Sequence, residues 1–305
     1  MTYFIQQCLN GLTLGGVYAL VALGYTMVYG IIQLVNFAHG EIFAAGGYLG
    51  VILFSFLRAH GLLAEHHWLC LILVLVLAMG YCAMLATAVE RVVYRPLRGS
   101  SRLSVLLSAL GMSIFLQNGL MLTQGVYNKA YPIELFHGDF QLGGVQLSVM
   151  QLLILGVTGG LLIALNILVF RTRIGRAMRA TAQDKTMSSL VGIDSNRIIA
   201  LTFAIGAALA AAAGIMVGLY YGSVRYDMGF VPGVKAFAAA VLGGVGNITG
   251  AMLGGLILGM AEIMAAAYIP HGSEYKDVFA FVILILVLYF LPTGLMGENV
   301  YDVRV

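Results

Sequence analysis

The stretch RTRIGRAMRATAQDKTMSSLVGIDSNR, residues 171–197, is the longest polar interruption in a sequence that is otherwise nearly all apolar. It holds six of the sixteen Lys and Arg residues and only two acids, Asp184 and Asp194. An apolar run without charges lies on each side of it, and each run is long enough to cross a bilayer. Because cytoplasmic loops of membrane proteins carry an excess of Lys and Arg, we predict that residues 171–197 form a cytoplasmic loop.

The composition places the whole chain in a membrane. Hydrophobic residues make up 61% of it and charged residues 10%, whereas about 25% of a soluble domain is charged, and the mean hydropathy is +0.96. At roughly 20 residues per crossing, the sequence predicts an all-α polytopic membrane protein with about eight transmembrane helices in a single domain, residues 1–305. The net charge of +3 comes from the loops and reflects orientation rather than nucleic-acid binding.

A second basic loop supports this orientation. Residues 90–102 carry four arginines, and two crossings separate them from residues 171–197, so both loops are expected on the cytoplasmic side. Residues 124–148 are poor in basic residues and are expected outside, with a hairpin in FQLGGVQLSV. Counting crossings backward puts the N-terminus outside. The first forty residues contain no charged side chain, so they lack the basic start of a secretory signal, and the side of the C-terminus stays open.

Two polar, glycine-containing breaks interrupt the apolar runs. One is NFAHGEIFAAGGYLG, residues 36–50, and the other is LGGVGNITG, residues 242–250. Irregular backbone at membrane depth is tolerated only where protein or a water-filled cavity surrounds it. We therefore predict one or two broken or re-entrant segments, including a short helix before Gly243, and we leave open whether residues 233–250 re-enter or span.

Polar side chains at these two breaks are the candidates for a translocation pathway or its gate, since such groups are costly inside a membrane and usually face a cavity or a partner. They are Asn36, His39, Glu41, Lys235, Asn247 and Thr249. Two interpretations stay open: the residues line a path for a polar solute, or they form a structural network that holds bent helices together. For Glu262, in the span after the second break, we favour interhelical hydrogen bonding.

The motifs of common enzyme classes are missing from the sequence. No Gly-Lys pair occurs, so there is no Walker A motif, and neither G-x-S-x-G nor H-E-x-x-H is found. The three cysteines are unclustered, and the adjacent His66 and His67 have only Glu65 beside them, a pattern more typical of a solvated loop than of a metal site. We expect no catalytic residue, no metal and no cofactor.

The basic loop itself divides into two parts. Residues 171–179 hold most of its charge, whereas residues 180–192 are weakly charged and carry small residues, Ala182, Thr186 and Ser189, at the spacing of a short helix. A helix of this kind suits a groove on a soluble partner. The alternative is that the loop only sets topology and contacts anionic membrane lipid.

This loop resembles the cytoplasmic coupling loop of ABC importer permeases, whose pattern is E-A-A, three residues, Gly. The matching stretch runs from Ala180 to Gly192, without a preceding Glu and with a longer spacing, as is typical of the branched-chain amino acid permeases. The chain resembles the H-type subunits of that family over nearly its whole length. The matching segments include LNGLTLGGVYALVALGYTMVYGIIQLVNFAHGE, ERVVYRPLR, RIGRAMRATAQD and KAFAAAVLGGVGNITGAMLGGLILG.

The resemblance implies one subunit of an importer in a bacterial inner membrane, with leucine, isoleucine and valine as its solutes. A second homologous permease would complete the pathway, two ATP-binding subunits would hydrolyse ATP, and a periplasmic solute-binding protein would deliver the amino acid. The residues expected to couple to the ATPases are Arg176, Arg179, Ala180, Ala182, Asp184, Ser188 and Gly192. A permease for urea or short-chain amides stays open as an alternative, as does a secondary carrier or channel.

Overall fold

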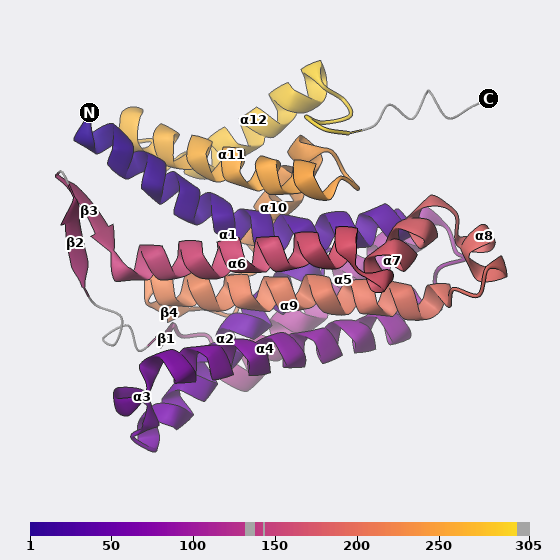
Figure 1. Ribbon diagram of the computed structural model, residues 1–305, viewed down its shortest axis with the longest axis horizontal. Helices are drawn as coiled ribbons and strands as arrows, with labels where there is room; N and C mark the ends of the chain where they lie inside the picture. The colour runs from indigo at the N-terminus through magenta and orange to yellow at the C-terminus, as the bar shows by residue number, and fades with distance from the viewer. Residues whose placement is uncertain (132–137, 143, 298–305) are drawn as a thin grey trace.

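A bundle of long helices lying side by side makes up the molecule (Figure 1). The structure, a computed structural model, describes residues 1–131, 138–142 and 144–297. Within these residues, seven helices are long and apolar enough to cross a membrane, which confirms the predicted all-α polytopic class. They are α1 (Thr2–Ile32), α2 (His39–Ala59), α4 (His67–Val89), α5 (Arg102–Gln124), α6 (Val149–Arg171), α9 (Ser195–Tyr221) and α11 (Ile248–Tyr268).

Shorter elements join these helices. The helical ones are α3 (Leu62–Glu65), a π-helical turn that extends α4 (Glu90–Tyr94), α7 (Arg173–Gln183), α8 (Lys185–Leu190), α10 (Phe230–Gly243) and α12 (Lys276–Phe290). Strand β1 (Lys129–Ala130) pairs antiparallel with β4 (Ser223–Val224), and β2 (Asp139–Leu142) with β3 (Val145–Ser148). The second pair confirms the predicted hairpin. Helix α12 occupies the eighth predicted span but has only 15 residues.

The bundle has two distinct ends. The N-terminus and the β2–β3 hairpin lie at one of them, which we call the hairpin end, where the backbone N–H of Gln146 donates to Oε1 of Gln6 at 2.9 Å. Helices α7 and α8 lie at the other, which we call the basic-loop end (Figure 1). There Nη1 of Arg98 donates to Oδ1 of Asn196 at 2.6 Å, which joins residues 90–102 to the start of α9. The two basic loops therefore share one end of the molecule, as predicted.

Helix α1 forms the centre of the bundle. In the most apolar part of α1, 89% of the segment is buried inside the molecule, compared with 11% in the most apolar part of α5. It packs against the antiparallel α11 through glycines, as helices do where lipid surrounds them. A Cβ atom added to Gly15 would lie 2.8 Å from Cα of Leu256, so the two backbones are in direct contact. The glycines of this seam are Gly11 and Gly15 on α1 and Gly255 and Gly259 on α11.

The break before α2 lies inside the bundle. Gln33 ends α1 in the left-handed conformation (φ 56°), and residues 33–38 turn the chain back along α1. The imidazole of His39 then lies against Gly24, more than two turns before the end of α1. Helix α2 thus starts well inside the molecule, as the polar break predicted.

The second break is resolved as a passage through the bundle. Val224 pairs with Lys129 at the hairpin end, and Gly246 lies against Gly30 near the last turn of α1, at the basic-loop end. Residues 222–247 therefore connect the two ends, through the non-helical residues 222–229 and the short helix α10. After α11 and α12, the N–H of Leu295 donates to the carbonyl of Leu242 at 2.9 Å, which places residues 291–297 at the basic-loop end.

Candidate functional site

Three candidate pathway residues meet at the start of α2. Asn36, His39 and Glu41 are 3%, 2% and 1% exposed. Oη of Tyr94, at the end of the π-helical turn, donates to Oδ1 of Asn36 at 2.7 Å. The imidazole of His39 packs edge-on against the ring of Tyr25, with 4.8 Å between the centroids. Glu41 lies in the first turn of α2, where the helix dipole favours a negative charge.

Two atoms of this cluster have no hydrogen-bond partner within the described residues. Oε1 of Glu41 accepts a hydrogen bond from Oγ of Ser113 on α5 at 3.4 Å, but Oε2 has no partner. Nε2 of His39 is also buried without one. A buried polar atom without a partner costs about 1–3 kcal/mol, so the arrangement is expensive unless a ligand or water completes it. These two atoms are the unpaired polar atoms of the cluster.

Lys235 lies in a separate cluster in which every charged group has an oppositely charged partner. Its Nζ is 2.8 Å from Oε1 of Glu262 and 2.5 Å from Oδ1 of Asp277. Oη of Tyr18 donates to Oε2 of Glu262 at 2.9 Å. Lys235 and Glu262 are each 2% exposed, whereas the side chain of Asp277 is 45% exposed. Four helices, α1, α10, α11 and α12, meet at this lysine.

The remaining pathway candidates lie in a third place. Asn247 caps α11: its Oδ1 accepts the N–H of Gly250 at 2.9 Å, and its Nδ2 donates to the carbonyl of Met296 at 2.8 Å. Thr249 is half-buried in the first turn of α11. The structure therefore brings the three residues of the first break together, and it separates them from Lys235 and from Asn247 and Thr249.

The basic loop forms two helices rather than one. The prediction that Ala182, Thr186 and Ser189 share a short helix is wrong, because the chain breaks at Asp184 between α7 and α8. The carboxylate of Asp184 accepts the backbone N–H groups of Thr186 and Met187 at 2.7 and 3.0 Å. This is the geometry of a helix N-cap, so the aspartate starts a new helix.

The expected coupling residues are mostly at the surface. Ala180 is half-buried and Ser188 buried, whereas Arg176, Arg179, Ala182, Asp184 and Gly192 are exposed. Gly192 has a φ of +86°, a conformation that favours glycine. The sequence interpretation missed three large apolar side chains at the tip of the loop, although their letters were visible in its weakly charged half. Met187, Leu190 and Val191 are 63%, 75% and 76% exposed, and we call them the α8 patch.

Basic side chains lie near the start of α8, the helix that carries this patch. Partial burial and the nearby guanidinium of Arg98 lower the pKa of Lys185, which starts α8. Arg98 itself forms an ion pair with the buried Glu90. The loop of residues 90–102 therefore lies near the start of α8 and contacts the start of α9 through Arg98.

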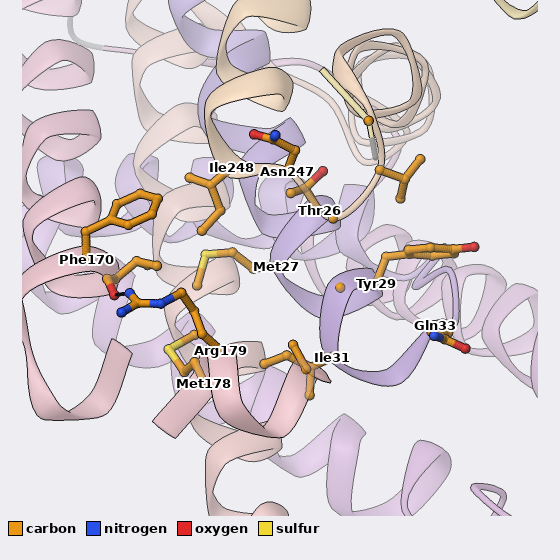
Figure 2. A pocket seen from close by; sticks show the side chains of 16 residues that line it. Thr26, Met27, Tyr29, Ile31, Gln33, Phe170, Met178, Arg179, Asn247 and Ile248 are labelled. Atoms are coloured by element: carbon orange, nitrogen blue, oxygen red, sulfur yellow. Dashed lines mark hydrogen bonds between the residues drawn. The ribbon is translucent and has the colours of Figure 1, made fainter. Parts of the chain in front are cut away.

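A pocket of about 660 Å³ opens at the basic-loop end (Figure 2). The last turns of α1, the end of α6, helix α7 and the loop before α11 line it. Three residues predicted from the sequence line this pocket. Arg179 and Ala182 are expected coupling residues, and Asn247 is a pathway candidate. Nη1 of Arg179 donates to the carbonyl of Val169, and its guanidinium lies 5.4 Å from the ring centroid of Phe170.

Comparisons with known proteins match nearly the whole length of the chain. The family model described as branched-chain amino acid transport system / permease component matches residues 7–288. The chain is 50% identical over 300 residues to the high-affinity branched-chain amino acid transport system permease protein BraD of Pseudomonas aeruginosa, covering 97% of this chain and 96% of that protein. It is 49% identical to LivH of Escherichia coli K12, with the same coverage. It is 26% identical over 300 residues to a probable LivH of Methanocaldococcus jannaschii, covering 92% of this chain and 88% of that one.

Proposed function

Because the chain belongs to the family of branched-chain amino acid transport system permease components, we propose that it is the permease subunit of an ATP-driven importer for leucine, isoleucine and valine. The observation that carries this proposal is the match to BraD and LivH, both named high-affinity permease proteins of such systems, at 49–50% identity over 97% of the chain. The whole of residues 1–305 serves as one transmembrane domain.

The importer contains other subunits. A second homologous permease completes the pathway, and a probable LivM permease, 29% identical to this chain over 147 residues, supports the existence of such a relative. Two ATP-binding subunits hydrolyse the nucleotide, since the sequence has no Walker A motif. A periplasmic solute-binding protein delivers the amino acid.

The buried cluster at the start of α2 is the part of the proposed pathway best suited to contact the solute. Oε2 of Glu41 is a buried acceptor without a partner, and an amino acid carries an ammonium group that donates. Asn36 holds this cluster to Tyr94. Lys235, Asn247 and Thr249 act in gating, because they lie where the short α10 meets α11 and α12.

The α8 patch is the proposed contact with an ATP-binding subunit. Three neighbouring large apolar side chains exposed on a loop that is otherwise basic and polar mark an interaction site. The flanking arginines add attraction for an acidic groove. Closure of the ATPases on ATP then moves α7 and α8, and the helices attached to them tilt to change the access of the pathway.

In the proposed orientation the basic-loop end faces the cytoplasm and the hairpin end faces the periplasm. Both basic loops lie at the first end and the N-terminus at the second, which agrees with the positive-inside rule. The chain is an integral protein of the inner membrane, and residues 291–297 end on the cytoplasmic side.

The function is tested by uptake into proteoliposomes that contain all the subunits. Radiolabelled leucine is offered with its binding protein, with and without internal ATP, and unlabelled valine, glutamate or urea compete. We expect uptake that needs ATP and that valine suppresses. Suppression by urea instead would support the amide importer, and uptake without ATPase subunits would support a secondary carrier.

The docking contact is tested by co-purification of the ATP-binding subunits. Ala182→Glu, Gly192→Asp and Leu190→Ser are each expected to release them from the detergent-solubilised complex. Leu122→Ser, an equally exposed leucine near the hairpin end, serves as the control and should leave the complex intact. ATPases that stay bound and coupled in all three loop variants would show that the assignment is wrong.

A further inference from the structure

The pocket under α7 combines an apolar wall with two polar side chains, those of Thr26 and Arg179, whose hydrogen-bonding capacity is not fully used. Met27 and Ile31 of α1 and Ile248 of α11 supply the apolar part (Figure 2). Arg179 lies on one side beside Phe170, and Thr26 lies across the pocket from it. A cavity of about 660 Å³ falls within the usual range for small-molecule sites, about 300–1,000 Å³, and such sites have mostly apolar walls with a few placed polar groups.

Thr26 is unusual for a threonine inside a helix. The hydroxyl of such a residue usually donates to the carbonyl three or four residues earlier. Oγ1 of Thr26 is buried and has no hydrogen-bond partner among the described residues. The residue is 0% exposed and is one of those that line the pocket. A buried hydroxyl without a partner is costly, which indicates that something else completes it.

Arg179 supplies the complementary group. Only its Nη1 donates within the described residues, to the carbonyl of Val169, and its guanidinium is held in place against Phe170. The other nitrogens are therefore available along one fixed edge. A guanidinium edge of this kind matches a carboxylate in a bidentate arrangement. Asn247, in contrast, already uses its amide on Gly250 and Met296.

We propose that this pocket binds an apolar α-amino acid: Arg179 holds the carboxylate, the hydroxyl of Thr26 accepts from the ammonium group, and the apolar wall takes the side chain. The proposal rests on the proposed function, because it places the transported class of solute at a second site, at the end where the solute leaves. Arg179 belongs to α7 and Thr26 to α1. A bound amino acid therefore ties the coupling loop to the central helix and slows the transport cycle when the product accumulates.

The site is tested by photolabelling of the full-length protein in nanodiscs with a diazirine analogue of leucine. Mass spectrometry locates the labelled residues, and an excess of leucine or of leucinamide, which lacks the carboxylate, competes. We expect labelling of α1 near Met27 and of α7 near Met178, suppressed by leucine and not by leucinamide. Arg179→Gln and Thr26→Val should each reduce this labelling at least tenfold.

Arg176→Gln is the matched control, because Arg176 lies one turn earlier on the same exposed helix and does not line the pocket. Equal labelling in Arg176→Gln and Arg179→Gln, or equal competition by leucinamide, would overturn the proposal. Labelling that disappears only when anionic phosphatidylglycerol is included in the nanodiscs would also overturn it and identify a lipid headgroup site. Normal ATP-dependent uptake together with an unlabelled pocket would reject this site and leave the proposed function standing.

Discussion

Two clusters of ionisable side chains inside the bundle differ in how their polar atoms are paired. Around Lys235, each charged group has a partner on another helix: Glu262 on α11, Asp277 on α12 and Tyr18 on α1. At the start of α2, Nε2 of His39 and Oε2 of Glu41 are buried to the same degree and have none. Both clusters carry the cost of desolvation, but only the first recovers it within the protein.

This difference indicates that the Lys235 cluster holds helices together, whereas the cluster at the start of α2 has polar atoms left to bind a solute. A buried pair with good geometry resists removal of either partner, so the Lys235 cluster fixes the relative positions of α10, α11 and α12. The cluster at His39 and Glu41 contains no ion pair that a mutation could break, because its contacts are a ring contact and a long hydrogen bond. Its substitutions should therefore affect transport more than stability.

The largest effect is expected for Lys235→Met. It leaves Glu262 buried without its cation, a change that costs about 3–5 kcal/mol. Thermal unfolding of the purified subunit in detergent should show a large fall in the midpoint. The double variant Lys235→Met with Glu262→Gln should recover part of the loss, because it removes the uncompensated charge. If Lys235→Met were as stable as the native protein, the contrast drawn between the two clusters would be wrong.

A matched pair of substitutions gives the next largest contrast. Glu262→Gln weakens the contact with Lys235 and should cost about 1.5–3 kcal/mol of stability, the worth of a hydrogen bond to a charged group. Glu41→Gln keeps the shape of the side chain and removes no comparable bond, so its unfolding midpoint should stay close to the native value while leucine uptake falls at least tenfold. Normal uptake by Glu41→Gln would return Glu41 to a structural role.

His39→Ala should have a smaller effect on stability. It removes an edge-on ring contact with Tyr25 that is worth about 0.5–1.5 kcal/mol beyond buried area. Uptake should fall, whereas the variant still co-purifies with its partner subunits. His60→Ala, at an exposed position on the same chain, is the control and should transport normally. Loss of assembly in His39→Ala would show that the imidazole is structural.

Asp277→Asn should have the smallest effect. Its side chain is 45% exposed as a whole, although the Oδ1 atom beside Lys235 is buried. The asparagine keeps an oxygen at this place and Lys235 keeps Glu262 as its partner, so the loss of stability should stay below that of Glu262→Gln. The unfolding midpoint in detergent measures this directly. A loss as large as that of Lys235→Met would mean that the two acids contribute equally, and the lysine cluster would have to be described as a triad.

Much of the architecture follows from the sequence because it depends on local patterns. The apolar runs predict the helices, the arginines of the two loops predict their common end, and the polar break before Gly40 predicts where α2 starts. The start of α8 was missed although Asp184 is a typical N-cap residue, because the spacing of small residues suggested one continuous helix.

The rest depends on contacts that no local pattern contains. Lys235 and Glu262 lie on different helices, and which faces of α10 and α11 meet is decided by packing across the bundle. Asp277 lies in the first turn of α12, where its charge resembles that of an ordinary loop residue. The passage of residues 222–247 through the bundle, and with it the position of residues 291–297, needs the contact of Gly246 with Gly30.

The seam between α1 and α11 limits how the sequences of this family can vary. The backbones touch at Gly15, where a Cβ would lie 2.8 Å from Cα of Leu256, so a substitution on one helix cannot be offset by a smaller residue on the other. Two positions that must both remain glycine show no correlated substitutions. This backbone contact is therefore one where covariation between homologues should be weakest, and saturation mutagenesis should reveal it as two stripes of intolerance with a spacing of four residues.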